Sequence, residues 1–570
     1  MIQYVLNLLA TLGSIKLNSF NHENQLQMKK SIYILILAIL LSPGVTVGQK
    51  NSGDNLPIVS GAMVAVVQTE SGKVKGYIHN GTYTYKGIPY GQAKRFMPAT
   101  KPAAWDGVRS SMAYGPVCPL INPTTNVSDE SEFAYHHDWG YPGEDCLRLN
   151  IWTQGINDGK KRPVMVWLHG GGYTAGSSQE LPSYDGENLS KKGDVVLISV
   201  NHRLNVLGFL DLSEFGEKYK SSANVGMIDL VMALEWVKNN VSNFGGDPNN
   251  VTIFGQSGGG GKVTTLMNAP SAKGLFHKAI VESGIDMPFQ ETAITKRIGS
   301  ALLTELGLIP STVDSIQKIP FVKLAAASQK ALQKVRDQLA AEGKPATGFG
   351  FGWTPTRDGA FLPYHPFAKE ALPISNDVPM LIGSTKNEFM PSLRANLRNA
   401  TLEQVTGYIK KERGDKADAF IAAAKKAYPK DTKPSDLIDI DLFFRSGMVN
   451  QANMKSAGST APVFMYLFTW QSPVVDGDYK SVHCMELPFV FNNISRCEEM
   501  TGGGKEAYAL AHKMSQSWIN FARTGNPNHK DLPAWQKYTA DNGATMFFDN
   551  QCVEKYHHDD DYLKLSGLLR

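Results

Sequence analysis

One serine in the sequence is surrounded almost entirely by glycine. Ser257 lies in the stretch FGQSGGGGKV, residues 254–263, and fits the pattern G-x-S-x-G. In that pattern the glycines remove side chains that would clash in a sharp strand-to-helix turn, and the turn exposes the serine hydroxyl as a nucleophile. A flexible glycine-rich loop is the alternative, because glycine also serves wherever a chain must bend. The context of the serine has to decide between these two readings.

A second glycine run supplies candidate donors for a developing negative charge. The stretch WLHGGGY, residues 167–173, ends an apolar run, and its glycines leave peptide N–H groups free to face an oxyanion. In hydrolases such a segment acts together with the N–H of the residue after the nucleophile, here Gly258. A plain strand-to-loop turn is the alternative. Two glycine motifs after apolar runs, in the expected order, favour an oxyanion hole.

A nucleophilic serine also needs a base and an acid, expected in the chain order Ser, then Asp or Glu, then His. Spacing alone does not choose among the histidines that follow Ser257, which are His277, His365, His483, His512, His529, His557 and His558. Two positions stand out by their setting. Glu388 follows the apolar run PMLIGS by a short turn, and His483 lies in a polar loop before an apolar segment.

Four short apolar runs closed by turn residues indicate the strands that position these residues. They are PVMVWL, DVVLISV, VTIFGQ and PMLIGS. Such runs suit strands buried on both faces of a parallel sheet. Residues 226–245 between them have apolar residues at helical spacing. The sequence therefore predicts an α/β fold, with a mostly parallel central sheet flanked by helices. Residues 286–345 are predicted to be a helical excursion, and a hairpin is expected at Ser71–Gly72.

Composition limits the function classes. The 570 residues are 42% hydrophobic and 19% charged, with a formal net charge of +4 and no long block of lysine or arginine. This is typical of a large globular chain and argues against nucleic acid as a partner. No zinc-binding spacing of cysteine or histidine occurs, and serine chemistry requires neither a metal nor an organic cofactor.

The N-terminal region is typical of an exported protein. Residues 28–48 begin with two lysines after a methionine, continue with an apolar run too short to span a bilayer, and end in small residues before Gln49. They are predicted to be a secretory signal peptide, with a buried helix or a membrane anchor as alternatives. Residues 1–27 would then precede the true start, and 49–62 would be a linker. We expect a secreted or periplasmic protein with no stable membrane span in the mature chain.

The chain from about residue 63 to 550 resembles the type-B carboxylesterase and cholinesterase family of α/β-hydrolases. The segments that carry the resemblance are EDCLRLNIW, VNHRLNVLGFL, NFGGDPNNVTIFGQSGGGG and WINFARTGNPN. The resemblance implies one α/β-hydrolase domain over residues 63–560, a C-terminal tail at 561–570, and a serine hydrolase acting on a small carboxylic ester. Family members that lost their catalytic groups serve as binding or adhesion proteins, and an amidase or peptidase on the same fold is a further alternative.

The resemblance also assigns roles to particular residues. It implies that the nucleophile is Ser257, the triad acid Glu388 and the general base His483. It implies that the oxyanion donors are the N–H groups of Gly171, Gly172 and Gly258. Ser283 matches a family serine near the triad acid.

Cysteine pairing follows the resemblance only in part. It implies a disulfide between Cys118 and Cys146. Cys484, Cys497 and Cys552 do not match the cholinesterase disulfides, so Cys484 and Cys497 either bridge locally or all three are free. Since the number of cysteines is odd, at least one is unpaired within the chain.

The chain departs from the family pattern without losing a catalytic group. Gln256 stands where the family usually has glutamate, Gly258 where alanine is frequent, and Phe389 where glycine often follows the acid. The tryptophan that binds quaternary ammonium in cholinesterases has no counterpart, so the resemblance does not imply a choline substrate. Aromatic residues that are candidates for lining a substrate pocket, or alternatively for core packing, are Phe349, Phe351, Trp353, Phe361 and Phe389.

Overall fold

The computed structural model describes residues 56–569, apart from 122–130, 285–287, 347–349 and 395–396. Residues 57–570 form one compact unit. The predicted signal peptide, the extension before it and most of the predicted linker lie outside the described residues. Within the described part of the chain, no helix is both long and apolar enough to cross a membrane.

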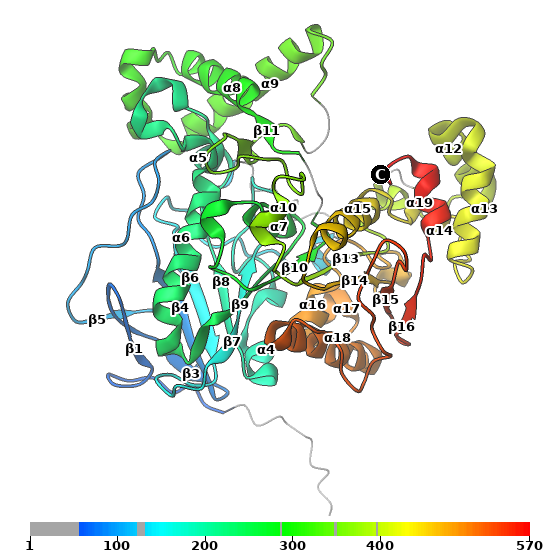
Figure 1. The fold of residues 1–570 in the computed structure, drawn as a ribbon, viewed down its shortest axis with the longest axis horizontal. Helices are drawn as coiled ribbons and strands as arrows, with labels where there is room; N and C mark the ends of the chain where they lie inside the picture. Colours follow the sequence, from blue (N-terminus) through cyan, green and yellow to red (C-terminus); the bar gives the residue numbers. More distant parts are fainter. Residues whose placement is uncertain (1–55, 122–130, 285–287, 347–349, 395–396, 570) are drawn as a thin grey trace, which may run out of the picture. The chain divides into compact units, whose positions relative to one another are not determined.

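A single mixed sheet of eleven strands forms the centre of this unit (Figure 1). The strands from β8 through β15 in the sheet are mutually parallel, and antiparallel strands flank them at both ends. This confirms the predicted α/β fold with a mostly parallel sheet. In order across the sheet, the strands are β16 (Val553–Lys555), β15 (Thr545–Phe548), β14 (Val463–Phe468), β13 (Met380–Thr385), β10 (Lys278–Glu282), β9 (Gly246–Gln256), β7 (Arg162–Leu168), β8 (Val196–Val200), β6 (Arg148–Thr153), β4 (Thr82–Pro89) and β3 (Tyr77–His79).

Both faces of the sheet are buried, as strand β7 illustrates. Val164, Val166 and Leu168 belong to one hydrophobic cluster, whereas Met165 and Trp167 belong to another. Successive side chains of a strand point to opposite faces, so an unbroken apolar run serves two cores at once. This is why the four apolar runs lack the alternation of a half-exposed strand.

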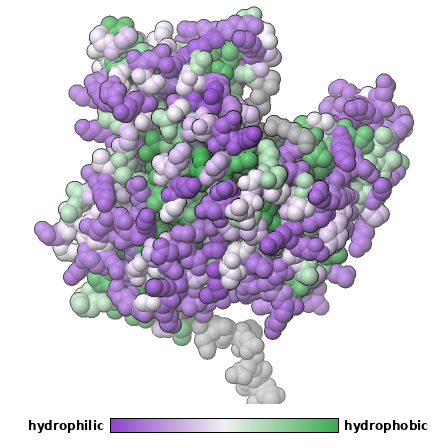
Figure 2. All heavy atoms as spheres, in the orientation of Figure 1, coloured by the Kyte–Doolittle hydropathy of each residue, from purple (hydrophilic) through white to green (hydrophobic). Residues whose placement is uncertain are grey.

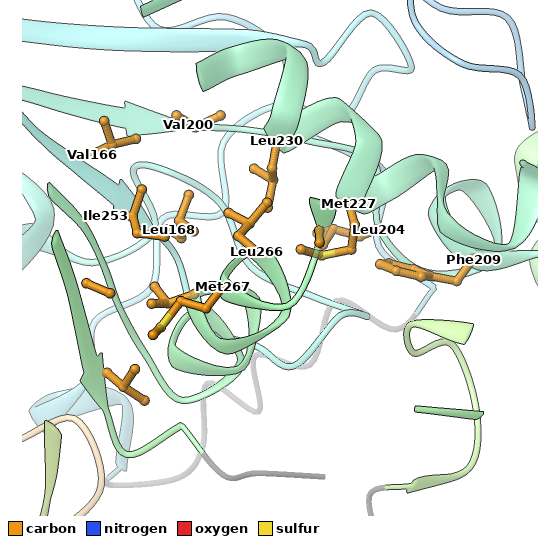
Figure 3. Packing of buried hydrophobic residues seen from close by; sticks show 14 of the residues in the cluster. Val166, Leu168, Val200, Leu204, Phe209, Met227, Leu230, Ile253, Leu266 and Met267 are labelled. Carbon is orange, nitrogen blue, oxygen red and sulfur yellow. The ribbon is translucent and has the colours of Figure 1, made fainter. Parts of the chain in front are cut away.

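Helices cover the two faces of the sheet. Side chains of α6 (Val225–Asn240) and α7 (Gly258–Met267) pack against β7 and β9 in the first cluster (Figure 3). The second cluster includes side chains of α18 (Lys505–Thr524) and α16 (Leu487–Val490). Further α-helices are α3 (Ser131–Ala134), α4 (Glu187–Gly193), α5 (Asn205–Phe209), α10 (Leu372–Ser375), α11 (Pro391–Arg394), α14 (Asp436–Asp439), α15 (Phe443–Gly458) and α17 (Glu498–Thr501).

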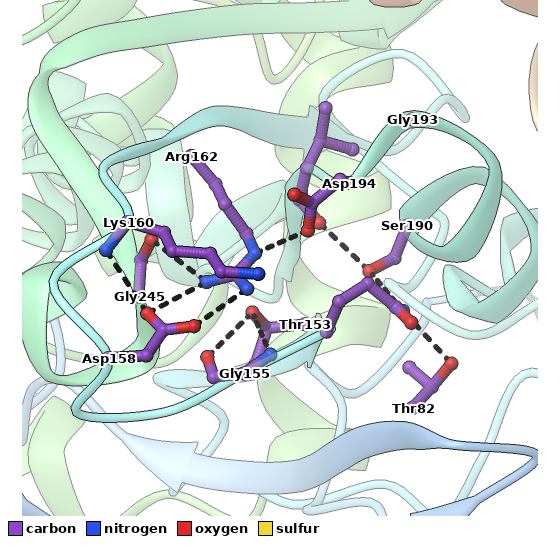
Figure 4. Close-up of polar contacts among 12 residues, drawn as sticks. Thr82, Thr153, Gly155, Asp158, Lys160, Arg162, Ser190, Gly193, Asp194 and Gly245 are labelled. Carbon is purple, nitrogen blue, oxygen red and sulfur yellow. Dashed lines mark hydrogen bonds and ion pairs between the residues drawn. The ribbon is translucent and has the colours of Figure 1, made fainter.

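A buried arginine joins the turns that precede three of the parallel strands. Arg162, at the start of β7, is 3% exposed. Its guanidinium donates to Asp158 at 2.7 Å, to Asp194 at 2.5 Å and to the carbonyl oxygen of Gly245 at 3.4 Å (Figure 4). Because these partners precede β7, β8 and β9 respectively, the contacts hold the amino ends of the three strands together.

Smaller elements surround the sheet. The expected hairpin is formed by β1 (Val66–Thr69) and β2 (Gly72–Lys75), with β5 (Val108–Ser110) beside β2. The expected helical excursion contains α8 (Thr292–Glu305) and α9 (Phe321–Ala341), which pack together, and β11 (Gln290–Glu291) pairs with β12 (Thr356–Arg357) next to it.

The segment predicted as a C-terminal tail includes a helix. Helix α19 (Asp560–Ser566) packs on α13 (Ala417–Ala427), which in turn contacts α12 (Leu402–Arg413). Tyr562 and Leu563 of α19 are buried. Hydrophilic side chains predominate on the face of the molecule drawn in Figure 2, with hydrophobic ones in patches between them.

Candidate active site

Ser257 lies at a sharp turn between β9 and α7. Its backbone angles are φ 57° and ψ −124°, a combination that residues other than glycine rarely adopt. Such a conformation costs about 1–3 kcal/mol and persists only where the surroundings hold it. Here the peptide N–H of Ser257 donates to the carbonyl oxygen of Glu282 at 2.8 Å, and its own carbonyl accepts from Gly261 at 3.0 Å. The glycine-rich stretch is therefore a strand-to-helix turn that hydrogen bonds hold in place.

The four glycines after Ser257 lie in close contact with neighbouring segments. A Cβ on Gly258 would lie 2.3 Å from the backbone of Gly172, and one on Gly259 would lie 2.0 Å from the carbonyl oxygen of Leu168. A Cβ on Gly260 would lie 2.7 Å from the backbone of Gly284, and one on Gly261 would lie 2.9 Å from the hydroxyl of Tyr173. Because the start of α7 has no side chains, the loops after β7 and β10 lie directly against its backbone.

Three peptide N–H groups around this turn are available to donate hydrogen bonds to a ligand. Among the described residues, none accepts a hydrogen bond from the N–H of Gly171, Gly172 or Gly258. Gly171 and Gly172 have φ of 79° and 64°, values that favour glycine. The N–H of Gly258 is the first of α7, where the helix dipole adds partial positive charge. An anion beside Ser257 would meet these donors.

Glu388 and His483 are brought together in the structure. Glu388 is fully buried, three residues after the end of β13, and one of its carboxylate oxygens is hydrogen-bonded to Nδ1 of His483. The other oxygen accepts from the hydroxyl of Ser283 at 2.6 Å and from the N–H of Thr385 at 3.0 Å. Three donors thus hold the carboxylate in one orientation against the imidazole.

Further contacts hold both the ring and the backbone of His483. The ring lies 4.5 Å from that of Phe389 and 5.3 Å from that of Phe444, measured between centroids, and the hydroxyl of Tyr135 donates to the His483 carbonyl at 2.8 Å. Gln256, next to the serine, has its side-chain nitrogen 3.4 Å from both ring nitrogens. No hydrogen bond joins the Ser257 hydroxyl to His483 in the described part of the chain, and such bonds are often long before substrate binds.

Two further buried carboxyl groups lie close to Glu388. Burial raises the pKa of Glu282 to about 8, although the indole N–H of Trp518 donates to it at 2.5 Å. Burial, reinforced by the charge of Glu388, raises the pKa of Glu486 well above its ordinary value. Burial therefore favours the neutral form of both carboxyl groups.

An apolar cavity of about 530 Å³ opens at Ser257. Of the aromatic residues predicted from the sequence, Phe351, Trp353 and Phe389 line it, Phe361 packs against the core instead, and Phe349 lies outside the described residues. The other lining residues include Gly172, Gly258, Phe289, Leu332, Arg336 and Phe444. Sequence reasoning missed Phe444 and Tyr135, because each comes from a helix or loop distant in the chain and belongs to no motif.

The expected disulfide between Cys118 and Cys146 is absent from the structure, where all five cysteines are free thiols. The neighbouring Cys118 thiol, together with burial, raises the pKa of Cys146 well above its ordinary value. The sulfur of Cys118 also accepts from the N–H of Leu204 at 3.2 Å. The local bridge considered for Cys484 and Cys497 is absent too.

Within the described residues, no group of three or more His, Cys, Asp or Glu side chains is arranged to hold a metal ion.

A sheet of this topology, with a serine turn after one parallel strand and a buried Glu–His pair beside it, defines an α/β-hydrolase. The chain belongs to the carboxylesterase family, whose model matches residues 63–562. It is 35% identical to the para-nitrobenzyl esterase of Bacillus subtilis (strain 168), over 85% of this chain and 95% of that protein. It is 33% identical to the phenmedipham hydrolase of Pseudarthrobacter oxydans, over 86% of this chain and 96% of that protein.

Solved structures agree with these relatives. An esterase from Clostridium hathewayi superposes with a TM-score of 0.79 and 37% identity, covering 91% of this chain and 99% of that one. A carboxylesterase from Geobacillus stearothermophilus superposes with a TM-score of 0.69 and 33% identity, covering 89% of this chain and all of that one. The protein is therefore a carboxylic ester hydrolase, as the sequence predicted.

Proposed function

We propose that the protein hydrolyses esters by two-step acyl transfer, with Ser257 as nucleophile, His483 as general base and Glu388 as the acid of the triad. The observation that carries this proposal is the hydrogen bond between His483 and the buried Glu388, formed beside the Ser257 turn where the cavity opens. A serine hydroxyl is a weak nucleophile until a base takes its proton, and an ionised partner stabilises the cationic base that results.

In the first step, His483 takes the proton of Ser257 as the hydroxyl oxygen attacks the ester carbonyl. The tetrahedral oxyanion is stabilised by the N–H groups of Gly171, Gly172 and Gly258, and one such donor contributes about 2.7–4 kcal/mol in other serine hydrolases. His483 then protonates the leaving alcohol. In the second step His483 activates water, which releases the acid from the serine.

The cavity favours esters with an aryl or a medium-length alkyl group. Its aromatic lining buries apolar surface, which contributes about 25 cal/mol per Å². The similar Clostridium hathewayi esterase is described as hydrolysing aliphatic aromatic polyesters, which fits a cavity of this kind.

Export is part of the proposal. Residues 28–48 would direct the chain out of the cytoplasm, to the periplasm or the medium, and would be removed before Gln49. Mass spectrometry of the N-terminal peptide of the exported protein tests this. A chain recovered outside the cytoplasm that begins at Gln49 is expected, and one that retains residues 28–48 would contradict it.

The catalytic assignment is tested by hydrolysis of para-nitrophenyl acetate, butyrate and octanoate. We expect turnover by the wild-type protein and its loss in Ser257→Ala and His483→Ala, with folding unchanged by circular dichroism. Ser311→Ala, at an exposed serine outside the cavity, is the matched control and should keep full activity. Retained turnover in folded Ser257→Ala would refute the assignment.

A further inference from the structure

A lysine is completely buried immediately behind the candidate oxyanion hole. Lys262, the fifth residue of α7, has no exposed surface. It follows the four glycines directly, so it is the first side chain of the helix that can reach a neighbouring loop. A buried lysine is rare unless its amine is hydrogen-bonded, because removing a polar group from water is costly.

The amine of Lys262 is bonded to the glycine loop after β7. Its Nζ donates to the carbonyl oxygen of His169 at 2.8 Å and lies 3.5 Å from that of Gly170. The Gly170 carbonyl also lies 3.0 Å from Nδ1 of His169. In the described part of the chain, no carboxylate lies within ion-pair distance of this amine, so the loop carbonyls are its partners.

These carbonyls control the direction of the N–H groups that follow them. The carbonyl of Gly170 and the N–H of Gly171 belong to one planar trans peptide group and point to opposite sides of it. A donor that holds this carbonyl therefore also orients the N–H of Gly171. Because hydrogen bonds in a chain polarise one another, the same contact makes that N–H a stronger donor.

The polar groups around Lys262 do not prevent its amine from binding the two loop carbonyls. Burial lowers the pKa of Lys262 to about 7, and the charge of Glu180 opposes that effect. Glu180 is occupied by other donors, the N–H of Ser177 at 2.9 Å and the hydroxyl of Tyr184 at 3.1 Å. Both the ammonium and the neutral amine retain at least two N–H groups, enough for two carbonyls.

We propose that Lys262 is a positioning residue for ester hydrolysis: by holding the carbonyls of His169 and Gly170, it aims the N–H of Gly171 at the oxyanion formed on Ser257. This inference rests on the function proposed above. It implies that the lysine acts on the transition state and leaves the binding of the ground-state ester unchanged.

The test is Lys262→Met, which keeps the length and volume of the side chain but removes the donor. With para-nitrophenyl butyrate, we expect kcat to fall about 10- to 100-fold, the range that a small misplacement of a catalytic group produces, while KM changes less than about threefold. Butaneboronic acid, which forms a tetrahedral adduct with an active-site serine, should bind more weakly by a similar factor.

The matched control is Lys455→Met. Lys455 is also buried, in α15, and its amine donates to the carbonyl oxygen of Ser375; neither residue lines the cavity. This variant should lose stability comparably but keep kcat. If Lys262→Met does not fold, Lys262→Gln replaces it. The glutamine side chain is polar but shorter than lysine, so its donor does not reach the loop carbonyls in the same way. We expect the same result, a reduced kcat and an unchanged KM.

A kcat and a boronate affinity within twofold of wild type in the folded variant would overturn the inference, and so would equal losses of kcat in both methionine variants. Ser257→Ala separates this outcome from a failure of the proposed function. If Ser257→Ala is inactive while Lys262→Met is fully active, only the role of the lysine is refuted.

Discussion

Glu282 should make the stability of the protein depend on pH in a predictable direction. The carboxyl is fully buried at the end of β10, one oxygen accepts from Trp518, and the other has no partner within the described residues. Burial raises its pKa from 4.5 to about 8 in the folded state. Because the folded-state pKa is raised, its contribution to stability is complete below pH 4.5 and is lost as the pH rises toward 8.

The magnitude follows from those two values. Each pH unit between them costs the folded state about 1.4 kcal/mol, so raising the pH from 6 to 8 should remove roughly 2–3 kcal/mol through Glu282. Glu282→Gln keeps the shape and an acceptor for Trp518 but cannot ionise. For a chain of this size the difference corresponds to a shift in melting temperature on the order of 2–3 °C.

The assay compares the melting temperatures of wild type and Glu282→Gln at pH 6 and pH 8, at one scan rate. The melting temperature of the variant should fall less between the two conditions, whatever its absolute stability. Glu305→Gln, at an exposed glutamate, should follow the wild type. Equal falls in the wild type and Glu282→Gln would refute the conclusion that burial keeps this carboxyl protonated.

Two substitutions around the turn test the geometry directly. Gly258→Ala places a Cβ 2.3 Å from the backbone of Gly172, so the loop after β7 must shift. The kcat for para-nitrophenyl butyrate should therefore fall about 10- to 100-fold. An unchanged kcat would contradict the close contact. Ser283→Ala removes a donor from the carboxylate of Glu388, a bond to a charged group of about 1.5–3 kcal/mol, and kcat/KM should fall about 10- to 100-fold. A loss below twofold would show that this hydroxyl does not orient the carboxylate.

Much of the sheet and of the site could be predicted because the signals were local. Apolar runs closed by turn residues marked β7, β8, β9 and β13, and parallel strands bring their carboxyl ends to one edge. Ser257 and Glu388 follow two of those strands, which is why their settings distinguished them. His483 comes fifteen residues after β14, and its selection needed the family resemblance as well as its local setting.

What could not be predicted depends on contacts between distant segments. A lysine after four glycines has the sequence signature of an exposed residue, and only the loop after β7 explains its burial. Phe444 reaches the cavity from α15, and Tyr135 contacts the site from a region without a motif. The thiol state of Cys118 and Cys146 likewise depends on a pairing geometry that spacing along the chain does not encode.

The run of glycines at the start of α7 links activity to the completion of folding. Each glycine disfavours a helix by about 1 kcal/mol relative to alanine, so this segment has little tendency to become helical by itself. Its first turn gains its shape from the loops after β7 and β10, which come from strands that pair in parallel and over long sequence separations. In the proposed mechanism, Ser257 is therefore reactive only in the assembled molecule, and an incompletely folded chain carries the residue without its reactivity. Under that mechanism, ester turnover reports the assembly of the central strands β7, β9 and β10.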